Sequence, residues 1–338
     1  MDTQTPKSQQ SPTSSSPYRG GQEGPSPRTK RLRWQLPLLA VLIIGTILII
    51  REQQSMPYQE NVGFVFGTEY HITYQYSDDL QAEIEAELKK VDNSLSIFNQ
   101  QSVISKINRN EDMTVNNMFE EVFNKAQTVS KETDGAFDMT VAPLVNLWGF
   151  GFKTGEEPSK QKVDSLMQFI GYQTVSITNK KVKKTYPQTM LDAAAIAKGY
   201  GCDVVARLLR DKDITNFMVE IGGEVITCGN SPKRIPWKIG VTKPVDDTLN
   251  TQQGQQAVLN VTNMAMATSG NYRNFYYKGG KKYAHTINPK TGYPVQHSLL
   301  SATVLAKDCA TADAFATAFM VMGIEKAKKV LEKHPDLM

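Results

Sequence analysis

A long helix begins within the stretch Leu191-Asp-Ala-Ala-Ala-Ile-Ala-Lys-Gly-Tyr-Gly-Cys-Asp203 and is expected to continue to about residue 209. The residues before it predict a hairpin over 62–76 that turns at Gly67, followed by helices with apolar side chains at helical spacing. The residues after it predict short strands and two closing helices. Because strand clusters and helices do not alternate regularly, this order favours an α+β fold with mixed sheets and packed helices over a doubly wound parallel sheet.

The expected elements share apolar residues at the period of a helix or of a strand. The helices are expected over about 80–95, 119–129, 163–170, 194–209, 310–321 and 324–334. The strands are expected over about 62–66, 70–76, 217–221, 225–228, 237–241, 257–261, 275–277 and 300–305, with short ones around 174–186.

The positive charge of the chain is concentrated at its N-terminus. Six basic and two acidic residues stand in positions 1–34 and account for the whole formal net charge of +4. The remaining chain is electrically balanced, whereas a nucleic-acid-binding domain carries its basic excess in its folded part. We therefore expect no nucleic-acid partner. With 40% hydrophobic and 21% charged residues, the chain is neither disordered throughout nor a polytopic membrane protein.

The commonest short signatures of catalytic and metal sites do not occur in the sequence. Cys202, Cys228 and Cys309 are too few and too far apart for a disulfide scaffold or a zinc knuckle, and whether any two of them pair stays open. There is no CxxC, HExxH, GxxxxGK[ST] or GxSxG pattern. The function must therefore be inferred from less familiar stretches.

The N-terminal region divides into a tail, an apolar run and a spacer. Residues 1–33, rich in Ser, Pro and Gln, predict a disordered basic tail. The apolar run 34–50 predicts a transmembrane signal anchor, since its 17 residues reach the short end of a membrane span and basic residues precede it. Residues 51–61 are expected to form a linker, and 62–338 a domain on the periplasmic, extracytoplasmic side of the inner membrane. A cleaved signal peptide is the alternative, although no small-x-small cleavage site follows the run.

The start of the long helix combines an acid with a lysine. Asp192 can cap free amides of the first helical turn, and taken alone this is the simpler interpretation. The same helix start presents backbone N–H groups and a positive dipole end to an anion. Lys198 can add a point charge there, which suits a phosphate-bearing ligand.

Two further stretches have polar residues in unusual places. Thr133–Gly151 contains two carboxylates, a proline and three glycines within an apolar run, which is atypical of a plain helix or strand. A capped turn that enters the core is the structural alternative. His285 stands where an expected strand runs into the turn Asn288-Pro-Lys-Thr-Gly292. A lone histidine is usually structural, but at a strand end it can act as a general base near neutral pH.

Asp313 and Thr317 stand four residues apart, on one face of an otherwise apolar helix. A buried Asp without a partner is costly. A carboxylate beside a hydroxyl group offers a hard oxygen site for Mg²⁺, which keeps few protein ligands and shares phosphate oxygens with its substrate. The structural alternative is that Asp313 caps the helix and Thr317 bonds back to it.

Together, seven stretches resemble the ApbE family, the FAD:protein FMN transferases, also called flavin transferases or thiamine biosynthesis lipoproteins. The resemblance covers roughly residues 62–335 and implies an ApbE/T-fold-like domain. The seven stretches follow the family's order and are Phe66–Tyr70, Thr133–Gly151, Asp192–Gly199, Glu220–Glu224, Ala267–Asn271, His285–Gly292 and Thr311–Thr317.

The resemblance also implies a set of site residues. His285 matches a proposed base, and Phe66 matches a flavin contact at which many relatives have Met. The Mg²⁺ ligands would be Asp313, Thr317 and the backbone carbonyl of Ala195. The positions that match those holding FAD, the donor substrate, are Ala136, Phe137, Asp138, Asp192, Lys198 and Ile287.

The reaction that the resemblance implies splits the FAD pyrophosphate, releases AMP, and joins FMN through a phosphoester to a Thr (or Ser) of a target protein. Such targets are typically subunits of membrane electron-transfer complexes that bear an exported flavinylation motif. Magnesium at pyrophosphate oxygens and a positioned base fit this chemistry. Two alternatives stay open: an FAD pyrophosphatase that gives FMN and AMP, and a non-catalytic flavin-binding protein.

Overall fold

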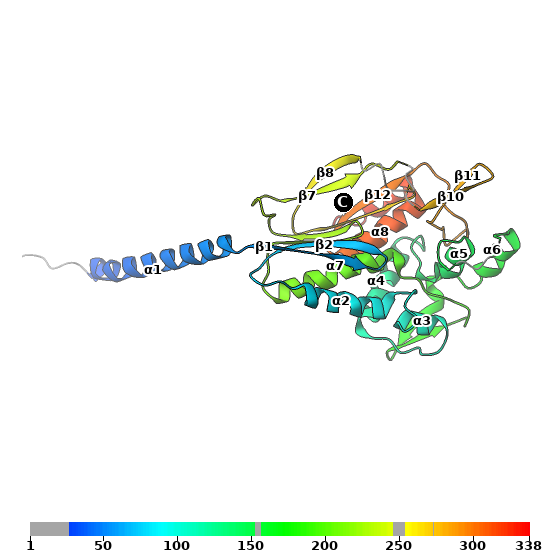
Figure 1. The fold of residues 1–338 in the computed structure, drawn as a ribbon, viewed down its shortest axis with the longest axis horizontal. Helices are drawn as coiled ribbons and strands as arrows, with labels where there is room; N and C mark the ends of the chain where they lie inside the picture. The colour runs from blue at the N-terminus through cyan, green and yellow to red at the C-terminus, as the bar shows by residue number, and fades with distance from the viewer. Residues whose placement is uncertain (1–26, 153–156, 246–253, 273) are drawn as a thin grey trace, which may run out of the picture. The chain divides into compact units, whose positions relative to one another are not determined.

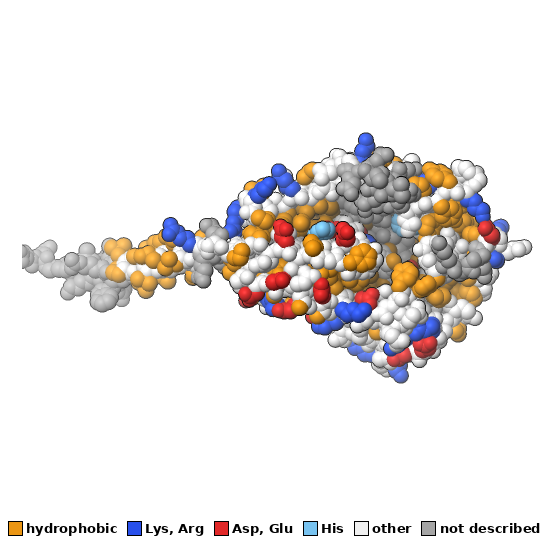
Figure 2. Space-filling view, viewed as in Figure 1, with side chains coloured by type: hydrophobic (Ala, Val, Ile, Leu, Met, Phe, Trp, Pro, Cys, Tyr) orange, Lys and Arg blue, Asp and Glu red, His pale blue; other side chains and the backbone are white. Residues whose placement is uncertain are grey.

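The protein is described from a computed structural model that covers residues 27–152, 157–245, 254–272 and 274–338. The chain divides into two compact units, Met1–Met56 and Pro57–Met338. The described part of the first unit is one helix, α1 (Pro27–Ser55; Figure 1). Its Leu, Ile and Val side chains between Leu36 and Ile50 are exposed (Figure 2). No helix in the described residues is both long and apolar enough to cross a membrane.

The boundaries expected at the N-terminus are wrong at two points. Residues 1–26 of the expected tail lie outside the described residues. Residues 27–33 belong to α1, which begins at Pro27, a residue type favoured in the first helical turn. The expected linker 51–61 is not a separate segment, since α1 continues to Ser55 and strand β1 begins at Tyr58. The register explains this early start: Tyr58 pairs with Gln75, so the first strand matches the full length of the second.

The core of the second unit is one six-stranded sheet, which confirms the α+β class. Every strand pair in the described residues is antiparallel. The expectation of sheets that mix parallel and antiparallel strands is therefore wrong. In spatial order the strands are β1 (Tyr58–Val65), β2 (Thr68–Gln75), β5 (Phe217–Ile221), β6 (Glu224–Cys228), β9 (Ala265–Gly270) and β12 (Ser301–Ala306). The first two are joined at Phe66 and Gly67, both at positive φ as in the two-residue turns of tight hairpins.

Helices cover one face of this sheet and a hairpin covers the other (Figure 1). The helices are α2 (Gln81–Leu95), α7 (Ala194–Asp211) and α8 (Cys309–Met322). On the helical face, buried side chains such as Ile72 of β2, Leu88 of α2 and Val205 of α7 belong to one apolar cluster. On the other face, the hairpin of β7 (Trp237–Thr242) and β8 (Gln255–Val261) packs Trp237 against Met266.

An outer layer packs on α7 and α8 on the side away from the sheet. It consists of α3 (Val103–Asn108), α4 (Asn117–Glu132), α9 (Ile324–Leu331) and the hairpin of β3 (Val175–Thr178) and β4 (Lys181–Lys184). Because α8 is covered on both sides, it is apolar nearly all round and rich in alanine. Any charged residue on α8 is therefore held in a buried environment.

Several of the remaining elements contribute to a smaller apolar cluster that includes Trp148, Val163 and Ile287. These remaining elements are the 3-10 turns η1 (Met139–Val141) and η2 (Tyr172–Thr174), helices α5 (Ala142–Leu147) and α6 (Lys160–Met167), and the hairpin of β10 (Phe275–Lys278) and β11 (Lys281–Ala284). The stretch Thr133–Gly151 is thus a turn, a single 3-10 turn and a short helix, which agrees with its atypical sequence.

Candidate functional site

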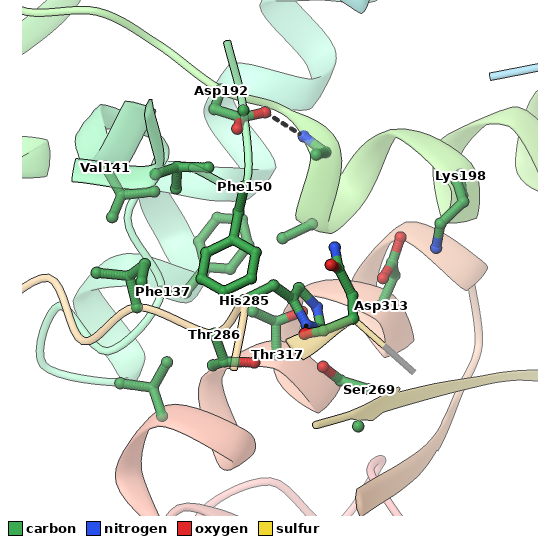
Figure 3. Close-up of a pocket in the computed structure, with 18 of the residues that line it drawn as sticks. Phe137, Val141, Phe150, Asp192, Lys198, Ser269, His285, Thr286, Asp313 and Thr317 are labelled. Atoms are coloured by element: carbon green, nitrogen blue, oxygen red, sulfur yellow. Dashed lines mark hydrogen bonds between the residues drawn. The ribbon is translucent and has the colours of Figure 1, made fainter. Parts of the chain in front are cut away.

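A cavity of about 430 Å³ lies where α7, α8 and the turns after α4 and β11 meet (Figure 3). It brings together every predicted site residue except Phe66. The predicted residues that line it are Ala136, Phe137, Asp138, Asp192, Ala195, Lys198, His285, Ile287, Asp313 and Thr317. The lining combines apolar side chains with charged and polar groups, among them Asp192, Lys198 and Asp313, which is the usual character of a small-molecule site.

The polar wall is built where α7 and α8 approach one another closely. The backbone N–H of Gly199 donates a hydrogen bond to Oδ2 of Asp313 at 3.1 Å. A Cβ atom on Gly199 would lie 2.4 Å from the carbonyl oxygen of Cys309, so a side chain at this position would separate the two helices. Glycine at 199 therefore allows the Asp313 carboxylate to contact the backbone of α7.

Lys198 and Glu224 form an ion pair in this wall, with 2.7 Å between Nζ and Oε1. Burial lowers the pKa of Lys198, but the charges of Glu224 and Asp313 outweigh it and leave this pKa raised. Burial raises the pKa of Glu224 and of Asp313. Two carboxylates thus stand near one ammonium group, which pairs with Glu224 alone, and this excess of negative charge in a region of low dielectric favours a further cation.

Asp138 holds together the turn that carries Phe137. Its Oδ1 accepts hydrogen bonds from the backbone N–H and the hydroxyl of Thr140, at 2.8 and 2.7 Å, and its Oδ2 accepts one from the N–H of Tyr172 at 2.7 Å. Burial raises the pKa of this carboxyl group. Because both oxygens already accept hydrogen bonds within the protein, Asp138 stabilises the conformation of this part of the cavity wall.

Asp192 lies two residues before the start of α7 and bonds to its first turn, although the N-cap position itself is Ala193, which provides no capping side chain. Its Oδ1 accepts a hydrogen bond from the N–H of Ala194 at 2.8 Å, and its own N–H donates to the carbonyl of Met139 at 2.7 Å. Asp192 also lines the cavity, and burial raises its pKa. Capping and contact with a ligand are therefore compatible at this residue.

His285 follows β11 directly and faces the cavity (Figure 3). Its Nδ1 lies 3.3 Å from the carbonyl oxygen of Asn274, which fixes the ring, and the ring of Phe150 meets it edge-on at 6.4 Å between centroids. Burial, together with the charge of Lys198, lowers the pKa of His285, while the contact with Asn274 acts in the opposite direction. A neutral imidazole at pH 7 can accept a proton.

Phe66 does not line the first cavity but a second one of about 500 Å³ beside it. The two cavities share Ile97, Phe98, Asp192, Ala194 and Lys198, so they adjoin at the start of α7. The Phe66 ring packs against Gly201, where an added Cβ would lie 2.6 Å from it.

The residues at the predicted magnesium site fit a hard cation. Asp313 and Thr317 lie one turn apart on α8 and line the same cavity as Ala195. The described residues contain no group of three or more His, Cys, Asp or Glu side chains suited to a metal. The predicted donors are instead one carboxylate, one hydroxyl and one carbonyl, a set of oxygens that would suit Mg²⁺ when phosphate and water complete the coordination.

Sequence reasoning missed several polar residues of the cavity. Glu224 belongs to the stretch Glu220-Ile-Gly-Gly-Glu224, whose two acids around a glycine pair were the available signal. Thr286, whose hydroxyl donates to Oδ1 of buried Asn271 at 2.6 Å, and Asn274 also line or support the cavity. Thr286 and Asn274 belong to no recognisable motif and stand at no characteristic spacing from other polar residues, so the sequence alone could not identify them.

The comparisons with known proteins agree with this geometry. The sequence model of the ApbE family matches residues 66–338. The FAD:protein FMN transferase of Haemophilus influenzae is 38% identical over 289 residues, covering 80% of this chain and 83% of the relative. That of Vibrio cholerae is 35% identical over 312 residues, covering 89% and 91%.

Two solved structures have the same fold. The flavin transferase ApbE from Vibrio cholerae has a TM-score of 0.75 at 35% identity and covers 83% of this chain and 92% of its own. The flavinyl transferase ApbE of Pseudomonas stutzeri, in its apo form, has a TM-score of 0.74 at 31% identity and covers 83% and 89%.

Proposed function

The chain belongs to the ApbE family, and on that premise we propose that it transfers FMN from FAD to a Thr or Ser hydroxyl group of a target protein, with Mg²⁺ bound at the site. AMP is the leaving group. Flavin transfer itself follows from the relatives named FAD:protein FMN transferase. The metal, the residue roles and the nature of the target are the proposed parts.

One observation supports the chemistry most directly: Lys198, Glu224, Asp313 and Thr317 meet in one wall of a cavity that His285 also lines. A pyrophosphate against this wall has an ammonium group and a helix N-terminus to bind its charge. The apolar lining beyond it, including Phe137 and Val141, suits a flat aromatic ring system.

The chain's own residues then perform the transfer. Lys198 binds and orients the pyrophosphate, which brings the phosphorus of the FMN half toward the incoming hydroxyl group. The hydroxyl oxygen forms the new bond to that phosphorus, the bond to the AMP oxygen breaks, and the hydroxyl proton passes to the imidazole of His285.

Asp313, Thr317 and the Ala195 carbonyl are the proposed Mg²⁺ ligands. When bound, the ion supplies positive charge that stabilises the pyrophosphate oxygens as negative charge moves onto AMP.

The transfer is tested with the full-length chain, FAD, Mg²⁺ and a co-expressed electron-transfer subunit that carries a flavinylation motif. The expected result is a mass increase of one FMN on the subunit, visible as in-gel flavin fluorescence, that EDTA abolishes. Free FMN and AMP with an unmodified subunit would instead indicate a pyrophosphatase. Unchanged FAD would leave only a flavin-binding protein.

The proposal also includes a tether to the inner membrane with the domain on the periplasmic side. Since no described helix combines the length and apolarity that crossing a membrane requires, this part of the proposal rests on the apolar run 34–50 and its basic flank. It is supported by the Leu, Ile and Val side chains of α1 between 36 and 50, which are 45–66% exposed. Such an uncovered apolar surface commonly marks a contact with membrane or protein.

Carbonate extraction of membranes and protease protection of intact spheroplasts test the tether. The full chain is expected in the extracted membrane fraction, with the domain cleaved by protease added from outside. Recovery in the soluble fraction would refute the tether, and protection from the protease would refute the orientation.

A further inference from the structure

The buried carboxyl group of Glu224 gains little from hydrogen bonds within the protein. Its side chain is 4% exposed, and Oε1 bonds to Lys198. Its Oε2 is also buried, and no group in the described residues forms a hydrogen bond with it. An unsatisfied buried acceptor is costly, so structural stability alone does not explain an acid at this position.

Lys198 has two carboxylates nearby but contacts only one of them. Its Nζ lies 2.7 Å from Oε1 of Glu224. No other carboxylate in the described residues lies within 4 Å of this ammonium group. Asp313 still acts on Lys198 electrostatically, which shows that it belongs to the same charged cluster. Its Oδ2 accepts a hydrogen bond from the N–H of Gly199 instead.

We propose that Glu224 is a positioning residue of the metal site: by binding the ammonium group of Lys198, it keeps that cation off Asp313 and leaves the Asp313 carboxylate for Mg²⁺. The inference rests on the proposed function. Without Glu224, the half-buried Lys198 keeps Asp313 as the carboxylate whose charge acts on it most, and an ion pair there would compete directly with the metal. Residues that orient the metal ligands without binding the metal commonly change metal affinity by about 10–100-fold.

The competition can be measured without any turnover. Mn²⁺, which serves as the spectroscopic probe for Mg²⁺, is titrated into the full-length protein and the free ion is counted by electron paramagnetic resonance. Glu224→Gln is expected to weaken Mn²⁺ binding by about 10–100-fold. Removing the competing cation as well, in the double variant Lys198→Met/Glu224→Gln, should restore most of that loss.

A matched control stands in the same stretch of sequence. Glu220 accepts a hydrogen bond from the N–H of Gly223 and does not line the cavity, and Lys198 is the weakest of the charges acting on it, so Glu220→Gln should change Mn²⁺ binding much less than Glu224→Gln. Thermal unfolding of each variant verifies the fold. If Glu224→Gln does not fold, Glu224→Met, which has a similar volume and no acceptor, replaces it in both comparisons.

Each outcome decides a separate point. Unchanged Mn²⁺ affinity in a folded Glu224 variant would overturn the inference and leave the proposed function intact. Weak binding that the double variant does not restore would overturn the competition with Lys198. A wild-type protein that binds no Mn²⁺ would overturn the metal part of the proposed function, and the inference with it.

Discussion

The backbone of Gly199 and the side chain of Asp313 are joined by a hydrogen bond of 3.1 Å, which ties α7 to α8 at the wall of the cavity. The contact depends on the missing side chain of Gly199, since an added Cβ would lie 2.4 Å from the backbone oxygen of Cys309. Sequence positions 114 residues apart are thereby fixed within one site.

Gly199→Ala should destabilise the protein by about 1–3 kcal/mol, the usual cost of overpacking a well-packed core. The obstacle is backbone, which cannot rotate away, so the two helices must separate and metal-dependent transfer should fall as well. Urea unfolding and the transfer assay measure the two effects. Gly201→Ala is the control: its Cβ meets the ring of Phe66, a side chain that can move, and the loss of stability should be smaller.

Asp313→Ala should abolish metal-dependent transfer while the fold remains intact. Loss of the proposed carboxylate ligand removes several kcal/mol of charge stabilisation, so the rate should fall by at least about 100-fold. Circular dichroism and an assay over a range of Mg²⁺ concentrations provide the measurement. A folded variant with the full rate would remove Asp313 from the metal site.

Thr317 allows a conservative comparison at the same site. Thr317→Ser keeps the hydroxyl group and should retain Mg²⁺-dependent transfer, whereas the isosteric Thr317→Val should raise the Mg²⁺ concentration required. Equal behaviour of the two variants would mean that the hydroxyl group does not bind the metal.

His285→Ala should lower turnover by about 10²–10⁴-fold and change FAD affinity much less, since a general base acts only on the reacting proton. Burial lowers the pKa of His285, so the wild-type rate should stay high below pH 6.5 and fall only when the imidazole becomes protonated at more acidic pH. The variant should lack this acidic limb. Weakened FAD binding with normal turnover would make His285 a binding residue instead.

Apolar periodicity explains which elements could be predicted from the sequence. α2 and α4 each bury one stripe, and the hairpin of β1 and β2 alternates around Gly67, so the pattern is local and visible. α7 is buried nearly all round from Gly199 to Ala206, and its length and alanine-rich start made it predictable. β9, with the sequence Ala265-Met-Ala-Thr-Ser-Gly270, was missed. Its small residues carry no strand signal, and its conformation depends on pairing with β6 and β12, which are distant in sequence.

The candidate site was predictable to a similar extent. Asp313 and Thr317 share a helix face, so their proximity follows from spacing alone. The pairing of Lys198 with Glu224 requires knowledge of how β6 lies against α7, which no local pattern contains. Phe66 was assigned by resemblance, and it occupies the adjoining cavity because the tight turn directs its ring onto Gly201.

Two aspartates cap the start of α8, and their environments shift their pKa values in opposite directions. Buried Asp203 of α7 accepts the N–H groups of Cys309 and Ala310, at 2.7 and 2.9 Å, and burial raises its pKa to about 7. Asp308 accepts the N–H of Thr311 at 2.9 Å; burial opposes its ionisation, but the charge of Lys125 prevails and leaves its pKa lowered.

The stability of the protein should therefore change with pH in opposite ways at these two residues. A folded-state pKa above the unfolded value means that the contribution of Asp203 is largest below about pH 4 and is lost as the pH rises to about 7, at up to about 1.4 kcal/mol per pH unit. Asp203→Asn should reduce the slope of urea-unfolding free energies measured between pH 4 and 8 by this share, while Glu224 and Asp313, whose pKa values burial also raises, keep theirs. Asp308→Asn should keep the slope, since the contribution of Asp308 is lost only as the pH falls through its lowered pKa. Equal slopes in wild type and Asp203→Asn would show that Asp203 remains ionised in the folded protein throughout this range.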